Sequence, residues 1–334
     1  IQNGDAITAT YDSPLGDPAT AAVGTYAINA TVFDPDTMLG NYTLINNVGT
    51  LTVTQRALVV TSDYQVKTYG DTFLDTSFTG SVVGLQNGDV ITPTYASAGA
   101  VATAPVGVYN ITVLPLIDND GVLGNYSVSY TIRTLTVERR ELIFTPTDRT
   151  KLYGDTIVFT SADGVVTGLQ NGDAITPNYS SPGAIATATV AGSPYPIIVT
   201  LSDPTGKLSN YNYTLNTGIL TVNQRTLIVT PDDKSKIYGT WFLAFSGTIT
   251  GIQNGENITA NYASAGSPPA AAVGTYPITA TLNDPTGKLA NYAVTLNTGT
   301  LTVTPSVLTV RADNKAIFYG DPDPAFTFLY SGFM

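Results

Sequence analysis

The stretch Lys67-Thr68-Tyr69-Gly70-Asp71 ends a short β-prone run in a corner that contains a glycine. The corner returns as Lys151-Leu152-Tyr153-Gly154-Asp155, as Lys236-Ile237-Tyr238-Gly239-Thr240 and as Phe318-Tyr319-Gly320-Asp321. Because the tyrosines are spaced by about 84 residues, the corner marks a tandem repeat. We predict that each ring anchors a core edge or an interface, and that each glycine permits positive φ or close backbone approach. The predicted structural residues are Tyr69, Gly70, Tyr153, Gly154, Tyr238, Gly239, Tyr319 and Gly320.

Other motifs keep the same period. The octet at 1–8 contains Gln-Asn-Gly-Asp, which predicts a tight turn or one helical turn, and it returns at 85–92, 169–176 and 252–259. Residues 24–32 alternate between apolar and polar side chains, as a half-buried strand does. The segment from each Asn-Tyr pair to Leu-Thr-Val predicts a closing hairpin, in three copies with a glycine two residues before the leucine.

The period divides the chain of 334 residues into three complete repeats and two partial ones. Only about three residues join each Leu-Thr-Val to the next strand, so the linkers are too short for flexible coils. We expect the repeats to stack end to end. The predicted boundaries are 1–54 (partial), 55–138, 139–223, 224–304 and 305–334 (partial).

The predicted fold class is all-β. Each repeat is expected to be an immunoglobulin-like sandwich, or a β-grasp-like sheet with one helical turn at Gln-Asn-Gly-Asp, with first and last strands parallel. The alternation also predicts a core, with the intervening threonines such as Thr52 and Thr136 outside. The predicted core residues are Tyr26, Ile28, Leu51, Val53, Leu58, Val60, Tyr69, Tyr109, Ile111, Tyr126, Leu135, Val137 and their later equivalents.

Composition argues against several partner classes. The net charge is −11 and only 12% of residues are charged, so no basic patch is expected for nucleic acid or anionic lipid. No apolar run reaches the roughly 18 residues of a membrane span. Cysteine is absent, which excludes disulfides and thiolate metal sites.

Few residues suit catalysis or metal binding. Histidine is absent and the glutamates are few, so no catalytic residue and no cofactor is predicted. The loop Asp118-Asn119-Asp120 is a weak calcium candidate, because Ca²⁺ takes several oxygen ligands from a short loop, but ordinary Asx turns also explain it. A Lys–Asn isopeptide bond at Lys67, Lys151 or Lys236 is another alternative.

The ordered set Lys-x-Tyr-Gly-Asp, Gly-Leu-Gln-Asn-Gly-Asp, Gly-Thr-Tyr-x-Ile, Asn-Tyr and Gly-Thr-Leu-Thr-Val resembles the MBG-type repeat of the YGX class, found in bacterial surface proteins and adhesins. The resemblance covers essentially the whole chain. It implies a mostly-β module, an exported or cell-surface setting, a role in spacing or adhesion, and no catalytic residues. The departures are Thr240 and Ile317 at corners, and Glu256 in the turn.

The functional hypothesis is a structural repeat region of an extracellular fibre, stalk or adhesin, with other copies of the repeat as partners. One alternative is an adhesive module that binds a surface glycan or protein through the loops at 96–106 and 180–193. Another is a spacer of a large secreted hydrolase. Residues 305–334 are expected to pack on the preceding repeat or on a neighbouring chain, either as part of a longer array or by strand complementation.

Overall fold

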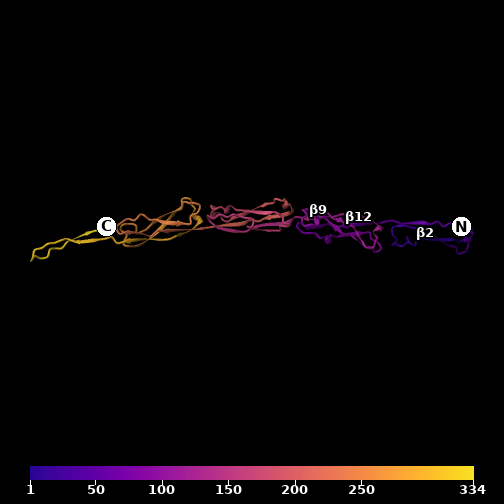
Figure 1. Ribbon diagram of the computed structural model, residues 1–334, viewed down its shortest axis with the longest axis horizontal. Coiled ribbons are helices and arrows are strands. Elements are labelled where there is room, and N and C mark those ends of the chain that lie inside the picture. The colour runs from indigo at the N-terminus through magenta and orange to yellow at the C-terminus, as the bar shows by residue number, and fades with distance from the viewer. The chain divides into compact units, whose positions relative to one another are not determined.

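A computed structural model describes residues 1–334, and its regular structure consists of β-strands and short 3₁₀ turns. Figure 1 traces the chain by residue number and labels β2, β9 and β12. The longest helix, η7 (Lys207–Asn210), has 4 residues, so the all-β prediction is confirmed. Thr, Val, Ile and Tyr are abundant, and β-branched and aromatic residues favour strands.

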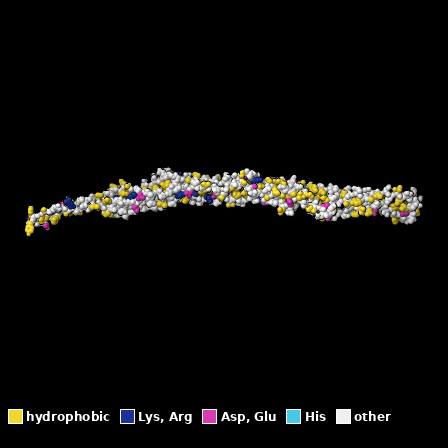
Figure 2. All heavy atoms as spheres, in the orientation of Figure 1, with side chains coloured by type: hydrophobic (Ala, Val, Ile, Leu, Met, Phe, Trp, Pro, Cys, Tyr) yellow, Lys and Arg dark blue, Asp and Glu magenta, His cyan; other side chains and the backbone are white.

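The chain divides into two compact units. The first comprises Ile1–Leu142, Thr167–Ile175 and Asp203–Thr214, and the second comprises Ile143–Val166, Thr176–Ser202 and Leu215–Met334. In Figure 2 charged side chains are sparse among uncharged ones on the visible face, as the composition predicts.

Residues 1–54 form one antiparallel sheet in the order β1-β2-β3. Its elements are β1 (Thr8–Asp12), β2 (Gly24–Phe33), η1 (Leu39–Asn41) and β3 (Gly49–Val53).

Residues 55–138 form two three-stranded sheets, β12-β4-β6 and β5-β13-β9, and the short strand pairs β10-β8 and β11-β7. The elements are β4 (Arg56–Ser62), β5 (Gln65–Thr68), η2 (Asp75–Ser77), β6 (Gly80–Val83), β7 (Ile91–Thr92), β8 (Tyr95–Ala96), η3 (Ala98–Ala100), β9 (Gly107–Asn110), β10 (Thr112–Val113), β11 (Ile117–Asp118), η4 (Leu123–Asn125), β12 (Tyr126–Thr131) and β13 (Thr134–Glu138).

Residues 139–223 include the four-stranded sheet β15-β20-β18-β17. The elements are β14 (Arg140–Pro146), β15 (Arg149–Leu152), β16 (Gly164–Thr167), β17 (Thr176–Ser180), η5 (Pro182–Ala184), η6 (Val190–Gly192), β18 (Tyr195–Ser202), η7, β19 (Tyr211–Leu215) and β20 (Gly218–Asn223).

Residues 224–304 form the sheets β23-β21-β26 and β22-β27-β25-β24, and β28 pairs with β29 beyond them. The elements are β21 (Arg225–Pro231), β22 (Lys234–Ile237), β23 (Gly247–Thr250), β24 (Thr259–Ala263), β25 (Gly274–Asn283), η8 (Leu289–Asn291), β26 (Tyr292–Leu296), β27 (Gly299–Thr304), β28 (Thr309–Ala312) and β29 (Phe328–Ser331).

The strands that open a repeat run parallel to those that close it, as predicted. β4 pairs in parallel with β12, with Leu58 opposite Val128, and β5 pairs in parallel with β13, with Lys67 opposite Val137. The same pairings recur between β21 and β26 and between β22 and β27. Two sheets without a covering helix correspond to the predicted sandwich rather than to the β-grasp alternative.

The predicted closing hairpin is wrong. β12 belongs to one sheet and β13 to the other, so the chain crosses between sheets instead of turning back on itself. The glycine before Leu-Thr-Val is needed because a neighbouring segment packs against it, and not because the chain turns there. A Cβ at Gly218 would lie 2.8 Å from the Pro146 side chain.

The Gln-Asn-Gly-Asp stretch is a tight turn, and its predicted helical alternative is wrong. The amide of Asp89 donates to the Gln86 carbonyl at 2.8 Å, with Asn87 at φ +56° and Gly88 at φ +79°. Two consecutive positive φ values define a type I′ turn. The 3₁₀ turns lie elsewhere in the repeat.

The core lies between the two sheets, on the predicted face. Leu58, Val60, Ile111 and Leu135 are fully buried. Tyr109 is only half-buried, because its hydroxyl reaches out to the Pro105 carbonyl. The four predicted core residues of 1–54 (Tyr26, Ile28, Leu51 and Val53) face the predicted side but are half-buried, since one sheet alone has no second sheet to cover it. Of the two intervening threonines, Thr52 is exposed and Thr136 is half-buried.

Candidate functional site: the junction between repeats

The Tyr-Gly corner is a type II β-turn. The amide of Asp71 donates to the Thr68 carbonyl at 3.1 Å, and Gly70 has φ +90°. A type II turn needs positive φ at its third residue, which explains the glycine. The corners at Gly154 and Gly239 have the same φ.

A buried lysine fixes each corner to a neighbouring loop. The Lys67 ammonium donates to the carbonyls of Asp71 at 2.9 Å and Ala100 at 3.3 Å, and also to that of Val101. Burial lowers the pKa of Lys67, and the Asp71 charge opposes that shift. Lys151 and Lys236 are equally buried and donate to the matching backbone carbonyls. These partners are main-chain oxygens and not the asparagine side chains that an isopeptide bond requires.

The Asn-Gly turn of the following repeat is also held rigidly. The Tyr211 hydroxyl donates to the Asp173 carboxylate at 2.7 Å and accepts from the Gln170 amide at 3.0 Å. Tyr211 is the tyrosine of the Asn-Tyr motif and is buried, so it joins the first residue of the turn to the last.

Corner and turn meet inside the first compact unit. The Tyr69 hydroxyl donates to Asp173 at 3.0 Å, and the Tyr69 ring packs edge-on against Tyr211 with 5.4 Å between centroids. Tyr69 is only 1% exposed as a result. A Cβ at Gly70 would lie 2.4 Å from Gln170 Cγ, so the glycine is also needed where the two repeats touch.

The second compact unit contains the same junction with a longer carboxylate. Tyr153 donates to one oxygen of Glu256 and Tyr292 donates to the other, the latter at 2.6 Å. The two rings pack edge-on with 5.5 Å between centroids, and Tyr153 is 1% exposed. At the first junction both tyrosines donate to the same oxygen of Asp173, whereas at the second each donates to a different oxygen of Glu256. Glutamate therefore replaces aspartate here without loss of either hydrogen bond.

An arginine in the linker binds the back of each corner. Arg140 Nε donates to the Tyr69 carbonyl at 2.6 Å, and its guanidinium pairs with Asp71. Arg225 Nε donates to the Tyr153 carbonyl at 2.5 Å, and its guanidinium pairs with Asp155. Charge-assisted bonds to a carbonyl are stronger than neutral ones, so the arginine adds to the tyrosine contact.

The asparagine of each Asn-Tyr motif completes the junction. Asn210 Oδ1 accepts from the Val106 amide at 3.0 Å, and Asn291 Oδ1 accepts from the Val190 amide at 2.9 Å. Both asparagines are 4% exposed, and burial of a polar side chain is tolerated when it is hydrogen-bonded.

The junction shifts the titration of its tyrosines. Burial raises the pKa of Tyr211 well above that of free tyrosine, and the hydrogen bond to Asp173 raises it further. Burial and Glu256 do the same to Tyr292. Both phenols therefore remain protonated donors through the neutral range.

The predicted corner residues fall into two groups. Tyr69, Gly70, Tyr153 and Gly154 lie in junctions, whereas Tyr238 is 39% exposed and Tyr319 is fully exposed. Burial was predicted for both tyrosines, and it is wrong, because no Asn-Gly turn packs on either corner: the turn at 253–256 contacts the corner at Tyr153 and Gly154 instead. At Gly239 the side chain of Met334 lies close instead, so residues 332–334 contact the preceding repeat.

The sequence prediction did not identify the partners of the corner. These are Gln170, Asp173, Tyr211, Arg140 and Asn210 at the first junction, and Gln253, Glu256, Tyr292, Arg225 and Asn291 at the second. Each recurs at one fixed repeat position. That shared period was the available signal, because residues with the same phase in every repeat can contact one another at every junction.

The calcium candidate is a backbone cap. The Asp118 carboxylate accepts from the amides of Val122 at 3.1 Å and Leu123 at 2.8 Å, and these bonds lower the pKa of Asp118. Asp34, Asp203 and Asp284 hold the equivalent loops in the same way. Asn119 and Asp120 are exposed, and no group of three or more His, Cys, Asp or Glu side chains is placed to hold a metal.

The two loops suggested for ligand binding supply junction carbonyls. In loop 96–106 the Ala102 carbonyl accepts from Gly70 at 3.1 Å and from Asn171 at 3.2 Å. In loop 180–193 the Ala186 carbonyl accepts from Gly154 at 3.1 Å and from Asn254 at 3.3 Å. Both loops therefore serve contact between repeats.

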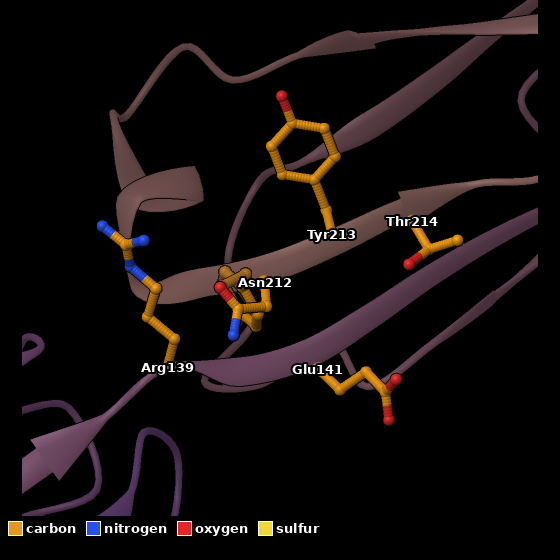
Figure 3. A pocket seen from close by; sticks show the side chains of 6 residues that line it. Arg139, Glu141, Asn212, Tyr213 and Thr214 are labelled. Atoms are coloured by element: carbon orange, nitrogen blue, oxygen red, sulfur yellow. The ribbon is translucent and has the colours of Figure 1, made fainter.

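A surface pocket of about 410 Å³ lies beside β19 (Figure 3). Asn212 and Thr214 lie on one face of the strand, and Tyr213 projects from the other. Arg139 and Glu141 point in different directions. Because these side chains do not converge, the pocket has no set of groups that could grip one small ligand. No helix in the chain is long and apolar enough to span a membrane.

Comparisons with known proteins place these observations in a family. The MBG domain family (YGX type) matches residues 58–136 and 227–302, which include the corners at Tyr69 and Tyr238. No curated protein matches the chain.

Among solved structures, similar chains include Drosophila N-cadherin EC1-4, at 10% identity and TM-score 0.26, with 91% of this chain and 93% of that chain covered. The N-terminal four Ig domains of Dscam1 isoform 8.4 align at 9% identity and TM-score 0.21, with coverages of 85% and 81%. The I9-I11 tandem of titin aligns at 10% identity and TM-score 0.20, with coverages of 76% and 98%. The family match and the recurring corner agree that the chain contains tandem MBG domains of the YGX type.

Proposed function

We propose that this chain is a non-catalytic, load-transmitting repeat region of an extracellular or cell-surface protein. Its role is to set a fixed geometry between successive repeats. The observation that carries the proposal is the junction itself, which is built twice from residues at the same repeat positions.

The linkers support this role because they leave almost no free chain. β13 ends at Glu138 and β14 begins at Arg140; β20 ends at Asn223 and β21 begins at Arg225. One residue separates the strands in each case, and Arg140 and Arg225 bind the preceding corner. A flexible tether needs many more residues without such contacts.

The energetics also favour a fixed joint. Each junction buries a tyrosine ring, and burying a large side chain contributes about 1.5–3 kcal/mol. Its hydrogen bonds each add about 1 kcal/mol. Together with the arginine contacts, these contributions are large enough to keep a junction closed most of the time.

The proposed partners are other repeats of the same kind, in the same or in neighbouring chains. The turn at residues 2–5 supports this, because it is already formed: Tyr42 donates to Asp5 at 2.8 Å and accepts from the Gln2 amide at 2.8 Å. Asn3 and Gly4 have the positive φ values of the junction turns and are exposed. This turn has the shape that a Tyr-Gly corner contacts elsewhere in the chain.

Distance measurements across the first junction would test the proposal. The chain has no cysteine, so Thr112→Cys and Asn212→Cys, both at exposed positions, would carry spin labels at unique sites. A narrow distance distribution is expected for the parent chain and a broad one after Tyr69→Ala. Equally broad distributions in both chains would contradict a fixed joint.

The surface location has its own test. Antibodies raised against the 334-residue chain should label intact source cells without permeabilisation. Labelling that requires permeabilised cells would contradict an extracellular role.

A further inference from the structure

Each junction turn contains an asparagine followed by glycine, and the asparagine amide reaches back to the preceding repeat. Its Nδ2 donates to a backbone carbonyl in a loop of that repeat, and for Asn171 and Asn254 this loop lies beside a Tyr-Gly corner. The bonds are Asn87 to Ala19 at 3.0 Å, Asn171 to Ala102 at 3.2 Å, and Asn254 to Ala186 at 3.3 Å.

The accepting carbonyl belongs to the corner as well. Ala102 O accepts from the Gly70 amide at 3.1 Å, and Ala186 O accepts from the Gly154 amide at 3.1 Å. One carbonyl thus joins the corner and the next turn. The contact requires a donor on the asparagine side, because a carbonyl oxygen can only accept.

Asparagine followed by glycine is also the chemically least stable pair in these turns. The backbone nitrogen of Gly172 can attack Cγ of Asn171, and Nδ2 leaves as ammonia while a five-membered succinimide closes. Water then opens the ring at either carbonyl, which gives aspartate or isoaspartate. Glycine favours the attack because it has no Cβ, and no atom lies within 4 Å of the place where one would stand at Gly172.

We propose that Asn171 and Asn254 are sites of spontaneous deamidation, and that conversion of either residue loosens the junction to which it belongs. The stability of each junction therefore decreases as the protein ages. The inference rests on the junction contacts and on general amide chemistry, and it holds in any cellular location.

Two physical effects link the chemistry to the junction. The aspartate product has no donor at neutral pH, so its carboxylate would face the Ala102 carbonyl oxygen across the former hydrogen bond. It would also add a negative charge beside Asp173, where Tyr69 and Tyr211 already share one carboxylate. The isoaspartate product inserts an extra backbone carbon and so disrupts the type I′ turn that places Gln170 under Gly70.

The first experiment measures the chemistry. The 334-residue chain is kept at mildly alkaline pH, and deamidation at each asparagine is followed by peptide mass spectrometry in ¹⁸O water. Asn171 and Asn254 should convert, whereas Asn178, an exposed residue followed by tyrosine, should not. Gly172→Ala should slow conversion at Asn171 alone. Equal rates at Asn171 and Asn178 would overturn the chemical half of the proposal.

The second experiment measures the consequence. Hydrogen exchange at the Val106 amide reports the first junction, because its acceptor is Asn210 of the next repeat. Asn171→Asp should accelerate this exchange by about 5-fold to 30-fold, the effect of losing one to two hydrogen bonds. Asn178→Asp adds the same charge in the same repeat and should leave it unchanged.

Two further readings make the second experiment decisive. Asn171→Gly keeps the positive φ but removes the amide, so a smaller acceleration than in Asn171→Asp separates donor loss from charge repulsion. The Val190 amide, which reports the second junction, should keep its exchange rate in every Asn171 variant. Unchanged exchange at Val106 in Asn171→Asp would overturn the proposed link between deamidation and the junction.

Discussion

The corner at Tyr69 and the corner at Tyr238 have the same backbone and opposite surroundings. Gly70 and Gly239 both have φ +90°, and Lys67 and Lys236 are both buried. Yet Tyr69 is 1% exposed and Tyr238 is 39% exposed. The corner therefore forms within its own repeat, whereas the burial of its tyrosine comes from the following one.

The two regions also differ in charge. Arg140 pairs with Asp71, and Arg225 with Asp155, but at the third corner Ser306 and Thr240 stand in the two places. Both members of the ion pair are replaced together. The backbone of the third corner is unchanged, with Gly239 at φ +90°, so the corner does not need the ion pair in order to form.

The largest expected effect comes from removing the covered tyrosine. Tyr69→Ala deletes a fully buried ring and its bond to Asp173, and loss of a buried aromatic ring costs about 3–5 kcal/mol. Tyr238→Ala is the matched control at an exposed corner and should cost about 1 kcal/mol or less. Chemical denaturation with hydrogen exchange at each repeat would measure both. Equal losses would mean that the corner tyrosine stabilises its own repeat and not the junction.

The next effect is a loss of junction stability at alkaline pH. The pKa of Tyr211 is raised in the folded state, so folding favours the neutral phenol. Its contribution is complete below the unfolded value of about 10 and is lost as the pH rises above that value. Each unit of pKa difference corresponds to about 1.4 kcal/mol.

Exchange at Val106 measured from pH 9 upward, after correction for the intrinsic rate, would show this loss. In Tyr211→Phe only the Tyr69 phenol still titrates at this junction, so the slope should become shallower although the junction is weaker throughout. A slope identical to that of the parent chain would show that Tyr211 is not the group responsible.

A smaller effect is expected for the arginine. Arg225→Ala removes a charge-assisted bond to the Tyr153 carbonyl and should cost about 1–2 kcal/mol at the second junction. Asp155→Asn removes only the partly exposed ion pair and should cost less than about 1 kcal/mol. Exchange at Val190 is the readout, and Ser306→Ala is the control without an expected effect. A larger loss for Asp155→Asn would reverse the assignment of the stabilising contact to the carbonyl.

Much of the fold could be predicted from the sequence, because the signals are local. Alternation over residues 24–32 gave the correct buried face, and Asn-Gly gave a tight turn. The prediction of a closing hairpin was wrong because a glycine can be required for two different reasons. It can allow the positive φ of a turn, or it can leave space for a packed neighbour, and at Gly218 the neighbour is the Pro146 side chain. The local sequence does not distinguish the two.

The candidate site was only half predictable. The Tyr-Gly corner was identified because it recurs, but its partner Asp173 lies 104 residues from Tyr69, and no local pattern connects the two. The Asn-Gly motif predicts that Asp173 belongs to a tight turn, and Asp173 is indeed the last residue of a type I′ turn. Its second role appears only when two repeats are placed together, since one carboxylate then accepts from a tyrosine of each repeat.

The smallest expected effect separates the two interpretations of Asp118. As a cap, its carboxylate accepts from two backbone amides, and Asp118→Ala should lower the melting temperature in calcium-free buffer. Because bonds from these amides lower the pKa of Asp118, its contribution to stability is complete at neutral pH and is lost as the pH falls through the pKa of the folded state.

As a calcium ligand, Asp118 would instead stabilise the parent chain only when calcium is added. The melting temperature of the parent chain is expected to be the same in calcium and in chelator, and Asp203→Ala, at the equivalent loop without a second aspartate, should cost as much as Asp118→Ala. A calcium-dependent increase that is lost in Asp118→Ala and kept in Asp203→Ala would restore the metal interpretation of residues 118–120, because that loop has a second carboxylate, Asp120, and the loop at Asp203 has none.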